Sequence, residues 1–239
     1  TINGNVYLTP GSTIIVNIGG KLTIENATLT CICPNSNWNG IIVKGNDDYP
    51  QSNYYHGVVE LNNSTIKNAN IGIMTWSHEK LTGGGIIIAK ESNFINNRIS
   101  ILMWPQTSKF QGINNQWVTI ENISYFRNCN FTNNCDNSAN LWGHNQYDIG
   151  DFINGMVNIL GVNGVVFKSC KFTNTNTGNF ANAGVGIKAG WSIFTLRTSS
   201  GSYASEFNNL NYGIETYCSD NTSIKDAIFN NNIRGVYLD

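Results

Sequence analysis

The sequence has few charged residues, few prolines and no long apolar run. Asp, Glu, Lys and Arg make up 12% of the 239 residues, about half the usual share, and the net charge is −1. Basic residues form no run along the sequence, which offers no electrostatic basis for binding nucleic acid or an anionic membrane. No apolar stretch approaches the roughly 20 residues of a membrane-spanning helix. We therefore expect no nucleic acid partner and no direct membrane insertion.

Linker and processing signals are also lacking. The chain has four prolines, and its 24 glycines are spread along its length, which favours one domain over residues 1–239. It has no initiator Met and no signal peptide, and it begins at Thr1 within a strand pattern, which predicts a processed or truncated product. It stops at Asp239 within a repeat, so we expect the natural protein to continue beyond this residue.

Asn, Ser and Thr supply much of the polarity that charged residues usually supply. Asn is depleted in strands and favoured in turns. A chain that is rich in Asn and also carries many Ile, Val and Phe residues is typical of an architecture with many short strands and many turns.

Seven short segments align along the chain, and each ends in a large apolar residue, the anchor. A small residue stands two positions before each anchor, and in all but the first segment Asn stands two positions after it. Because side chains two apart share one face of a strand, these positions form columns when coils stack. The anchors are Leu29, Ile66, Phe94, Phe131, Phe172, Phe207 and Phe229; the small residues are Ala27, Ser64, Ser92, Cys129, Cys170, Ser205 and Ala227; the Asn column is Asn68, Asn96, Asn133, Asn174, Asn209 and Asn231.

The spacing between anchors varies from 22 residues, between Phe207 and Phe229, to 41 residues, between Phe131 and Phe172. Variable spacing favours short coils with loops of different length over a helical array or a propeller. A second apolar strand follows each anchor, and a third precedes it. The second strands contain Gly40, Gly72, Ser100, Gly186, Gly213 and Gly235, and the third strands are expected at 58–61, 86–88, 118–120 and 165–167.

These patterns predict an all-β fold, a right-handed three-faced parallel β-helix that forms a solenoid of about seven or eight coils. Coils that stack at roughly 4.8 Å place like residues over one another. We therefore expect stacked Phe rings in the core and amide-to-amide hydrogen bonds in a structural Asn ladder. Cys129 and Cys170 lie in the small-residue column, where we expect stacked buried thiols, with a disulfide as the alternative.

The opening segments 9–16 and 19–24, the segment 38–43 (Trp-Asn-Gly-Ile-Ile-Val) and the anchor motifs carry a family resemblance. They resemble the right-handed parallel β-helix superfamily, which includes pectate-lyase-like proteins and large bacterial surface proteins. The segment 38–43 and the anchor motifs are similar to β-helix regions of surface proteins exported by type IX secretion systems. The resemblance implies the fold and an extracellular or cell-surface location. It implies little about function, because this scaffold serves lyases, hydrolases, adhesins and stalks.

Catalytic motifs of the β-helix enzymes are not found in the sequence. The four arginines stand at different offsets from their anchors, which predicts that they do not form one column, and the three histidines fall in predicted loops and are expected to be solvated. Two carboxylates near an aromatic cluster in the loop 135–156 are the nearest approach to a glycosidase pair. The candidates in this loop are Trp142, His144, Tyr147, Asp148 and Asp151. We predict no catalytic residue, no metal and no cofactor.

Aromatic residues recur four or five positions after the Gly or Ser of the second strand. They are Trp76, Trp104, Trp191 and Tyr217, here called the aromatic row. If the neighbouring Ile73, Ile101 and Ile214 point inward, alternation sends the row outward, where its rings could stack on sugars. The alternative is that the long loops fold back over these rings and bury them.

The hypothesis that follows is a non-enzymatic extracellular or cell-surface module, an adhesin or stalk, that binds polysaccharide through the aromatic row. Its partners would be polysaccharide or another surface or secretion protein. The alternatives are a polysaccharide lyase or glycoside hydrolase with an unrecognised site, and a purely structural spacer. An open coil at the C-terminus would leave an unpaired strand edge, so we expect further coils or a partner to cover it.

Overall fold

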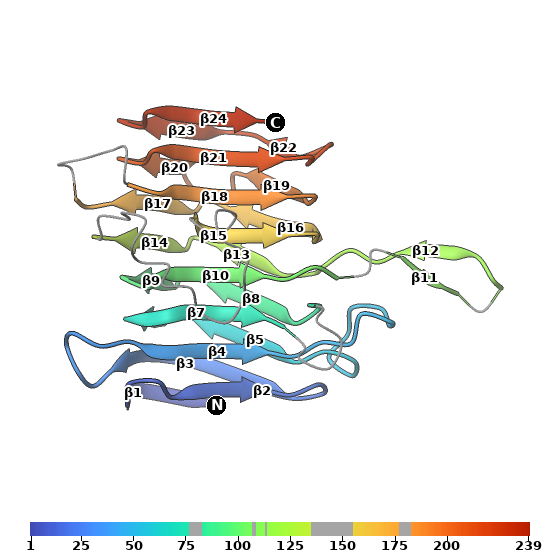
Figure 1. Cartoon of the computed structure of the whole chain (residues 1–239), viewed down its shortest axis with the longest axis horizontal. Helices are drawn as coiled ribbons and strands as arrows, with labels where there is room; N and C mark the ends of the chain where they lie inside the picture. Colours follow the sequence, from blue (N-terminus) through green and yellow to red (C-terminus); the bar gives the residue numbers. More distant parts are fainter. Residues whose placement is uncertain (77–82, 107–108, 113, 135–154, 177–182) are drawn as a thin grey trace.

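The computed structural model is a parallel β-helix, as the sequence predicts (Figure 1). It describes residues 1–76, 83–106, 109–112, 114–134, 155–176 and 183–239. None of these residues is in an α-helix, so the described part of the chain contains no helix that could cross a membrane. The chain runs along the front sheet in Figure 1, returns behind it and rises by one coil, which is a right-handed path. The two termini lie at opposite ends of the stack.

Each coil contributes strands to three faces, which we number from the face on which the long strand β3 begins. Faces 1 and 2 form one continuous sheet that bends within the long strand β3 (Lys21–Cys31). The first half of β3 pairs with face 1, and its second half pairs with face 2. Face 1 continues through β5 (Val58–Asn62), β8 (Ile86–Lys90), β13 (Tyr125–Arg127), β16 (Asn163–Lys168), β19 (Ile193–Arg197) and β22 (Ser223–Ile224).

Face 2 and face 3 complete the triangle. Face 3 is the eight-stranded sheet, which gives eight coils in the described part of the chain and agrees with the predicted seven or eight. Face 2 contains β1 (Ile2–Leu8), the end of β3, β6 (Thr65–Lys67), β9 (Asn93–Ile95), β14 (Asn130–Asn133), β17 (Lys171–Asn174), β20 (Ser205–Asn208) and β23 (Ala227–Asn230). Face 3 contains β2 (Thr13–Val16), β4 (Trp38–Val43), β7 (Ala69–Thr75), β10 (Ile99–Met103), β15 (Gly155–Leu160), β18 (Val185–Gly190), β21 (Tyr212–Tyr217) and β24 (Arg234–Leu238).

The anchors form the centre of the core, in the register that the repeat predicts. Each anchor pairs with the anchor of the next coil, from Leu29 with Ile66 to Phe207 with Phe229. The rings of Phe94, Phe131, Phe172 and Phe207 stack with centroids 4.7 to 4.9 Å apart. Stacked rings at this spacing exclude water and add a directional preference to the burial of apolar area.

The small-residue column has a polar role that the sequence did not predict. The Ser64 and Ser92 hydroxyls each accept a hydrogen bond from the backbone N–H of the coil before, at 3.2 Å, and Ser205 does the same for Cys170 at 3.0 Å. These hydroxyls satisfy amides at a corner where the strand ladder is interrupted. Cys129 and Cys170 are buried free thiols, as predicted, and burial raises the pKa of the Cys170 thiol.

The corners explain why the chain is rich in Asn. The residues that turn the chain from face 1 to face 2 have φ between 46° and 55°, and four members of the Asn column turn it from face 2 to face 3 with φ between 52° and 59°. Asn tolerates this left-handed region better than most residues. The first corner holds Asn26, Asn63, Glu91, Asn128, Ser169 and Asp226, and the second holds Asn68, Asn96, Asn209 and Asn231.

The structure corrects three details of the predicted strands and loops. Residues 118–120 do not form a face 1 strand, because β12 (Trp117–Thr119) pairs antiparallel with β11 (Lys109–Gln111) in a hairpin that projects from the stack (Figure 1). The face 1 strand of that coil is β13 instead. The strands β15 and β19 were not predicted, although Val157 occupies the same inward position as Ile101 and Ile187. His56 was expected to be solvated but is buried.

Candidate functional site

The outer surfaces of the three faces carry the candidate sites, because the interior is packed with apolar side chains. Of the predicted site residues, those in the loop at 135–156 lie outside the described residues, namely Trp142, His144, Tyr147, Asp148 and Asp151. The aromatic row and the Asn column lie within the described residues and can be placed.

The N-terminal part of the aromatic row is covered. Trp76 is buried, and Trp104 is half-buried beside it. Both belong to a small apolar cluster on the outside of face 3 that includes Met74, Leu102 and Leu160. Alternation along β7 and β10 sends these side chains outward, as predicted, yet they are shielded from water. Trp76 therefore packs as a residue of a second, smaller core.

The C-terminal part of the aromatic row divides into two environments. Gly190, not Trp191, pairs with Tyr217 on the next coil, so Trp191 lies one position outside the row. Trp191 occupies the corner between face 3 and face 1 with φ of 50°, and 58% of its surface is exposed. Tyr217 remains on face 3 and is partly buried. The structure therefore does not bring the four rings into one continuous platform.

Tyr217 belongs to a buried polar group on the outside of face 3. Its hydroxyl donates to Glu215 Oε1 at 2.5 Å, and Lys188 Nζ lies 3.2 Å from Glu215 Oε2. The side chains of Lys188 and Glu215 are only 5% and 8% exposed. Lys188 Nζ also lies 5.2 Å from the centre of the Tyr217 ring. The hydrogen bond to Glu215 raises the pKa of Tyr217, because it holds the phenol proton in place.

Face 1 carries a column of basic side chains that sequence analysis missed. It consists of Lys90, Arg127, Lys168 and Arg197, which pair with one another on four consecutive coils. We call these four residues the basic column. The residue before each of them is buried in the core, so alternation along the strand places the basic side chain outside. Lys225 continues the column, since its N–H donates to the Leu196 carbonyl and it follows Ile224, the partner of Leu196.

Arg127 and Arg197 both belong to this column, which their different offsets did not indicate, whereas Arg98 and Arg234 lie at face 3, so the four arginines do not form one column. The signal was present in the aligned segments: Lys90, Arg127, Lys168 and Lys225 each stand four positions before their anchor. Arg197 stands ten positions before Phe207 and could not be aligned in this way. Strand pairing places it beside Lys168 despite the longer connection.

A ring and a shallow hollow adjoin the basic column on face 1. Tyr125 lies two residues before Arg127, and its ring centre is 5.9 Å from both Lys90 Nζ and Lys168 Nζ. Tyr125 pairs with Ile88 on one side and Val166 on the other. The hollow begins at Ile88 and is lined by Lys21, Ser52, Asn53, Val58, Glu60, Ile86, Ile88 and Ile123.

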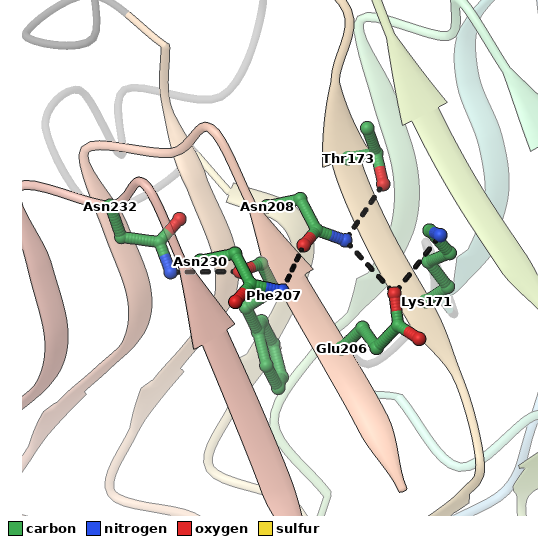
Figure 2. A network of polar contacts seen from close by, with 7 residues as sticks. All are labelled: Lys171, Thr173, Glu206, Phe207, Asn208, Asn230 and Asn232. Carbon is green, nitrogen blue, oxygen red and sulfur yellow. Dashed lines mark hydrogen bonds and ion pairs between the residues drawn. The ribbon is translucent and has the colours of Figure 1, made fainter. Parts of the chain in front are cut away.

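Face 2 presents amides and an exposed ion pair to the outside (Figure 2). Asn230 Nδ2 donates to Asn208 Oδ1 at 2.9 Å, and Lys171 Nζ lies 3.0 Å from Glu206 Oε2. Asn208 Nδ2 lies 3.4 Å from Glu206 Oε2. The contact with Lys171 lowers the pKa of Glu206. A comparable amide pair joins Asn130 to Asn93 three coils earlier at 2.9 Å, so hydrogen-bonded Asn pairs do form on stacked coils, as predicted.

The predicted Asn column combines two kinds of residue. Asn133 and Asn174 end strands and are buried, and their Nδ2 atoms donate to the backbone carbonyls of Asn97 and Ala183 at 3.4 and 3.1 Å. The other four are the corner residues with positive φ. Within the column, Asn231 Nδ2 donates to Asn209 Oδ1 at 3.4 Å, which is the predicted amide-to-amide contact.

Other ionisable side chains of the described region do not gather into a reactive group. His56 Nε2 lies 3.3 Å from the Tyr49 carbonyl and 3.2 Å from the Pro50 carbonyl, and burial lowers the pKa of this histidine. In the parts of the chain that the structure describes, no three His, Cys, Asp or Glu side chains converge on a point that could hold a metal ion. Comparison with known proteins gives no match to a family model, a curated protein or a solved structure.

Proposed function

We propose that the chain is a non-enzymatic module of an extracellular or cell-surface protein, an adhesin or stalk, that binds polysaccharide along the outside of its solenoid. The observation that carries the proposal is the register. Equivalent residues of successive coils pair with one another on all three faces, so each outer surface repeats along the axis. A linear polymer laid along this axis meets side chains at equivalent positions of every coil.

The aromatic side chains support a carbohydrate ligand. Trp191 exposes more than half of its surface at the corner that leads from face 3 into face 1. Trp104 is half-buried on the outside of face 3. Exposed aromatic rings provide apolar faces on which pyranose rings can stack, with polar groups nearby to fix their orientation. The extracellular location and a relation to type IX secretion cargo rest on the sequence resemblance.

The test is a binding screen of the 239-residue chain against soluble neutral and anionic polysaccharides by affinity electrophoresis, with released sugar assayed in the same samples. The double variant Trp104→Ala/Trp191→Ala is expected to lose binding that the Trp117→Ala variant keeps. Trp117 is a matched control, because it is 69% exposed on the projecting hairpin, away from the three faces.

Each other outcome favours a different function. Failure to bind any polysaccharide would favour a structural spacer. Release of unsaturated or reducing-end sugar would favour a lyase or a hydrolase. Binding that is equally strong in both variants would show that the chain binds polysaccharide without using Trp104 and Trp191.

A further inference from the structure

We infer that face 1 binds a linear polysaccharide that carries carboxylate or sulfate groups, aligned with the solenoid axis over the basic column. This inference rests on the proposed function, and it names the surface and the chemical class of the ligand. It differs from the aromatic-row hypothesis, because the residues that carry it are charged and lie on another face.

The charge distribution is the first argument. The chain has 14 Lys and Arg residues and a net charge of −1, yet four of these residues stack on consecutive coils of one face. Like charges on neighbouring strands repel one another. Among the described residues, Glu91 Oε1 lies 3.8 Å from Arg127 Nη2, and this pair is largely exposed and weak. A polyanion would relieve the repulsion along the whole column.

On the other two faces, basic side chains are paired with acids on neighbouring coils. On face 2, Lys171 pairs with Glu206, and on face 3, Lys188 pairs with Glu215. In both pairs the acid stands on the coil after the base, at the paired position of the neighbouring strand. In the basic column the equivalent position on the next coil is occupied by another base. The positive charge of the basic column is therefore not neutralised by the mechanism used on the other two faces, although Lys21 and Glu60 form an ion pair elsewhere on face 1.

The spacing of the column is the second argument. Neighbouring strands lie about 4.8 Å apart, so the basic groups repeat at short, regular intervals along the axis. A linear polysaccharide with acidic rings presents its charges at regular intervals along an extended chain. Arg127 and Arg197 can each bind a carboxylate or a sulfate through two parallel hydrogen bonds, and the lysines add point charges between them.

The apolar neighbours of the column favour a sugar chain over a nucleic acid. Tyr125 offers a ring between Lys90 and Lys168, and its neighbours in the adjacent column are Ile88 and Val166. One ring between aliphatic side chains suits the C–H faces of pyranose rings. Binding of single-stranded nucleic acid usually relies on several aromatic side chains that stack on successive bases. Ile88 also lines the neighbouring hollow, whose apolar residues Val58, Ile86 and Ile123 lie beside the ion pair of Lys21 and Glu60.

The experiment compares two double variants that remove the same charge from different faces. Arg127→Gln/Lys168→Gln removes two charges from the basic column. Lys67→Gln/Lys171→Gln removes two from face 2, where both side chains are also solvent-accessible. The probes are a linear polyuronate, dextran sulfate, neutral dextran and a single-stranded polynucleotide, and the dissociation constant is measured by affinity electrophoresis at low and high salt.

We expect the polyuronate or dextran sulfate to bind, with an affinity that falls as salt rises. The face 1 double variant should weaken this binding by roughly tenfold or more, because it removes two charged partners of the ligand's anionic groups. The face 2 double variant should leave it within about twofold of the parent chain. Tyr125→Leu should weaken it less than the loss of two charges.

Four outcomes would overturn the inference, and the first three can be told apart from failure of the proposed function. Equal weakening by both double variants would show that net charge, not the column, governs binding. A polysaccharide that binds with unchanged affinity to both double variants would exclude the column while leaving the proposed function in place. Tighter binding of the polynucleotide than of either anionic polysaccharide would assign face 1 to a different class of polymer. A chain that binds none of the polysaccharides would contradict the inference and the proposed function together.

Discussion

Face 1 and face 3 are both built from parallel strands, but their outward side chains differ in exposure to water. On face 3, Leu102 is 1% exposed, and the ion pair of Lys188 and Glu215 is almost completely shielded from water. On face 1, the basic column and Tyr125 remain partly or fully exposed. Parallel strand pairing fixes the positions of these side chains on both faces, so the difference does not arise from the backbone.

The comparison shows which outer surface contributes to stability and which is free to bind. Burying a pair of opposite charges has a desolvation penalty, and each charge is then stabilised mainly by the other. Charges that stay in water cost little, stabilise little and are available to a ligand. We therefore expect substitutions on face 3 to change folding and substitutions on face 1 to change binding.

The largest effect is expected from Glu215→Gln, which leaves Lys188 buried without its counter-charge. We expect the free energy of unfolding to fall by about 3–5 kcal/mol, the usual result of removing one partner of a buried pair. The control is Glu60→Gln, which breaks the exposed pair with Lys21 (2.8 Å) and should cost less than about 1 kcal/mol. Urea unfolding followed by circular dichroism measures both values. Similar losses in the two variants would contradict the comparison.

Leu102→Ala should produce the next largest effect. Leu102 points outward from β10 but packs in the cluster with Met74 and Trp76, so its truncation should cost about 2–4 kcal/mol, as in a core. Val166→Ala, at a half-buried outward position on face 1, should cost less than about 1 kcal/mol. Thermal unfolding of both variants tests this. A small effect of Leu102→Ala would show that the outer cluster of face 3 does not behave as a second core.

His56 allows a pH test at the connection from face 3 to face 1. Burial lowers its pKa from the ordinary value of 6.5, so the unfolded chain binds a proton more readily than the folded chain. Protonation of this histidine should not change the free energy of unfolding well above pH 6.5. Below that value it should reduce the free energy of unfolding by at most about 1.4 kcal/mol per pH unit. Urea unfolding at several pH values should show a shallower acid dependence in His56→Gln than in the parent chain; equal slopes would argue against the burial.

The smallest change in stability is expected from Lys168→Gln in the basic column. Its neighbours Arg127 and Arg197 carry the same charge, so its removal should change the free energy of unfolding by no more than about 0.5 kcal/mol, toward greater stability at low salt. The gain should disappear at high salt, where the repulsion is screened. Thermal melts at two salt concentrations measure it. A clear loss of stability would mean that Lys168 holds face 1 together.

The repeat predicted the core well because the core depends on local rules. Alternation decides which side of a strand a residue faces, and the recurrence of Phe at the anchor decides which residues stack. These rules predicted the anchor pairs and the two stacked thiols, Cys129 and Cys170. The same rules failed at 118–120, where an apolar alternation belongs to a projecting hairpin. Alternation cannot distinguish a strand of the solenoid from a strand of a loop.

The candidate sites were harder to predict, because exposure depends on what lies over a side chain. Trp76 and Trp191 both belong to the predicted aromatic row, yet one is buried and the other is exposed. Trp191 lies one residue outside the row because Gly190 pairs with Tyr217. The spacing in the sequence did not indicate this register. Nothing in the local sequence indicated that Lys188 and Glu215 would be shielded on the outside of the solenoid.

The sequence by itself determined the coil, since alternating apolar residues, a recurring anchor and Asn at left-handed corners leave little freedom in how one turn folds. Only the tertiary structure decided which side chains of different coils lie together on the outside. Arg197 stands ten residues before its anchor, and Lys168 stands four, yet strand pairing places them side by side. The extra residues are accommodated at the corner, because the hydrogen bonds between strands, and not the length of the connection, set the register.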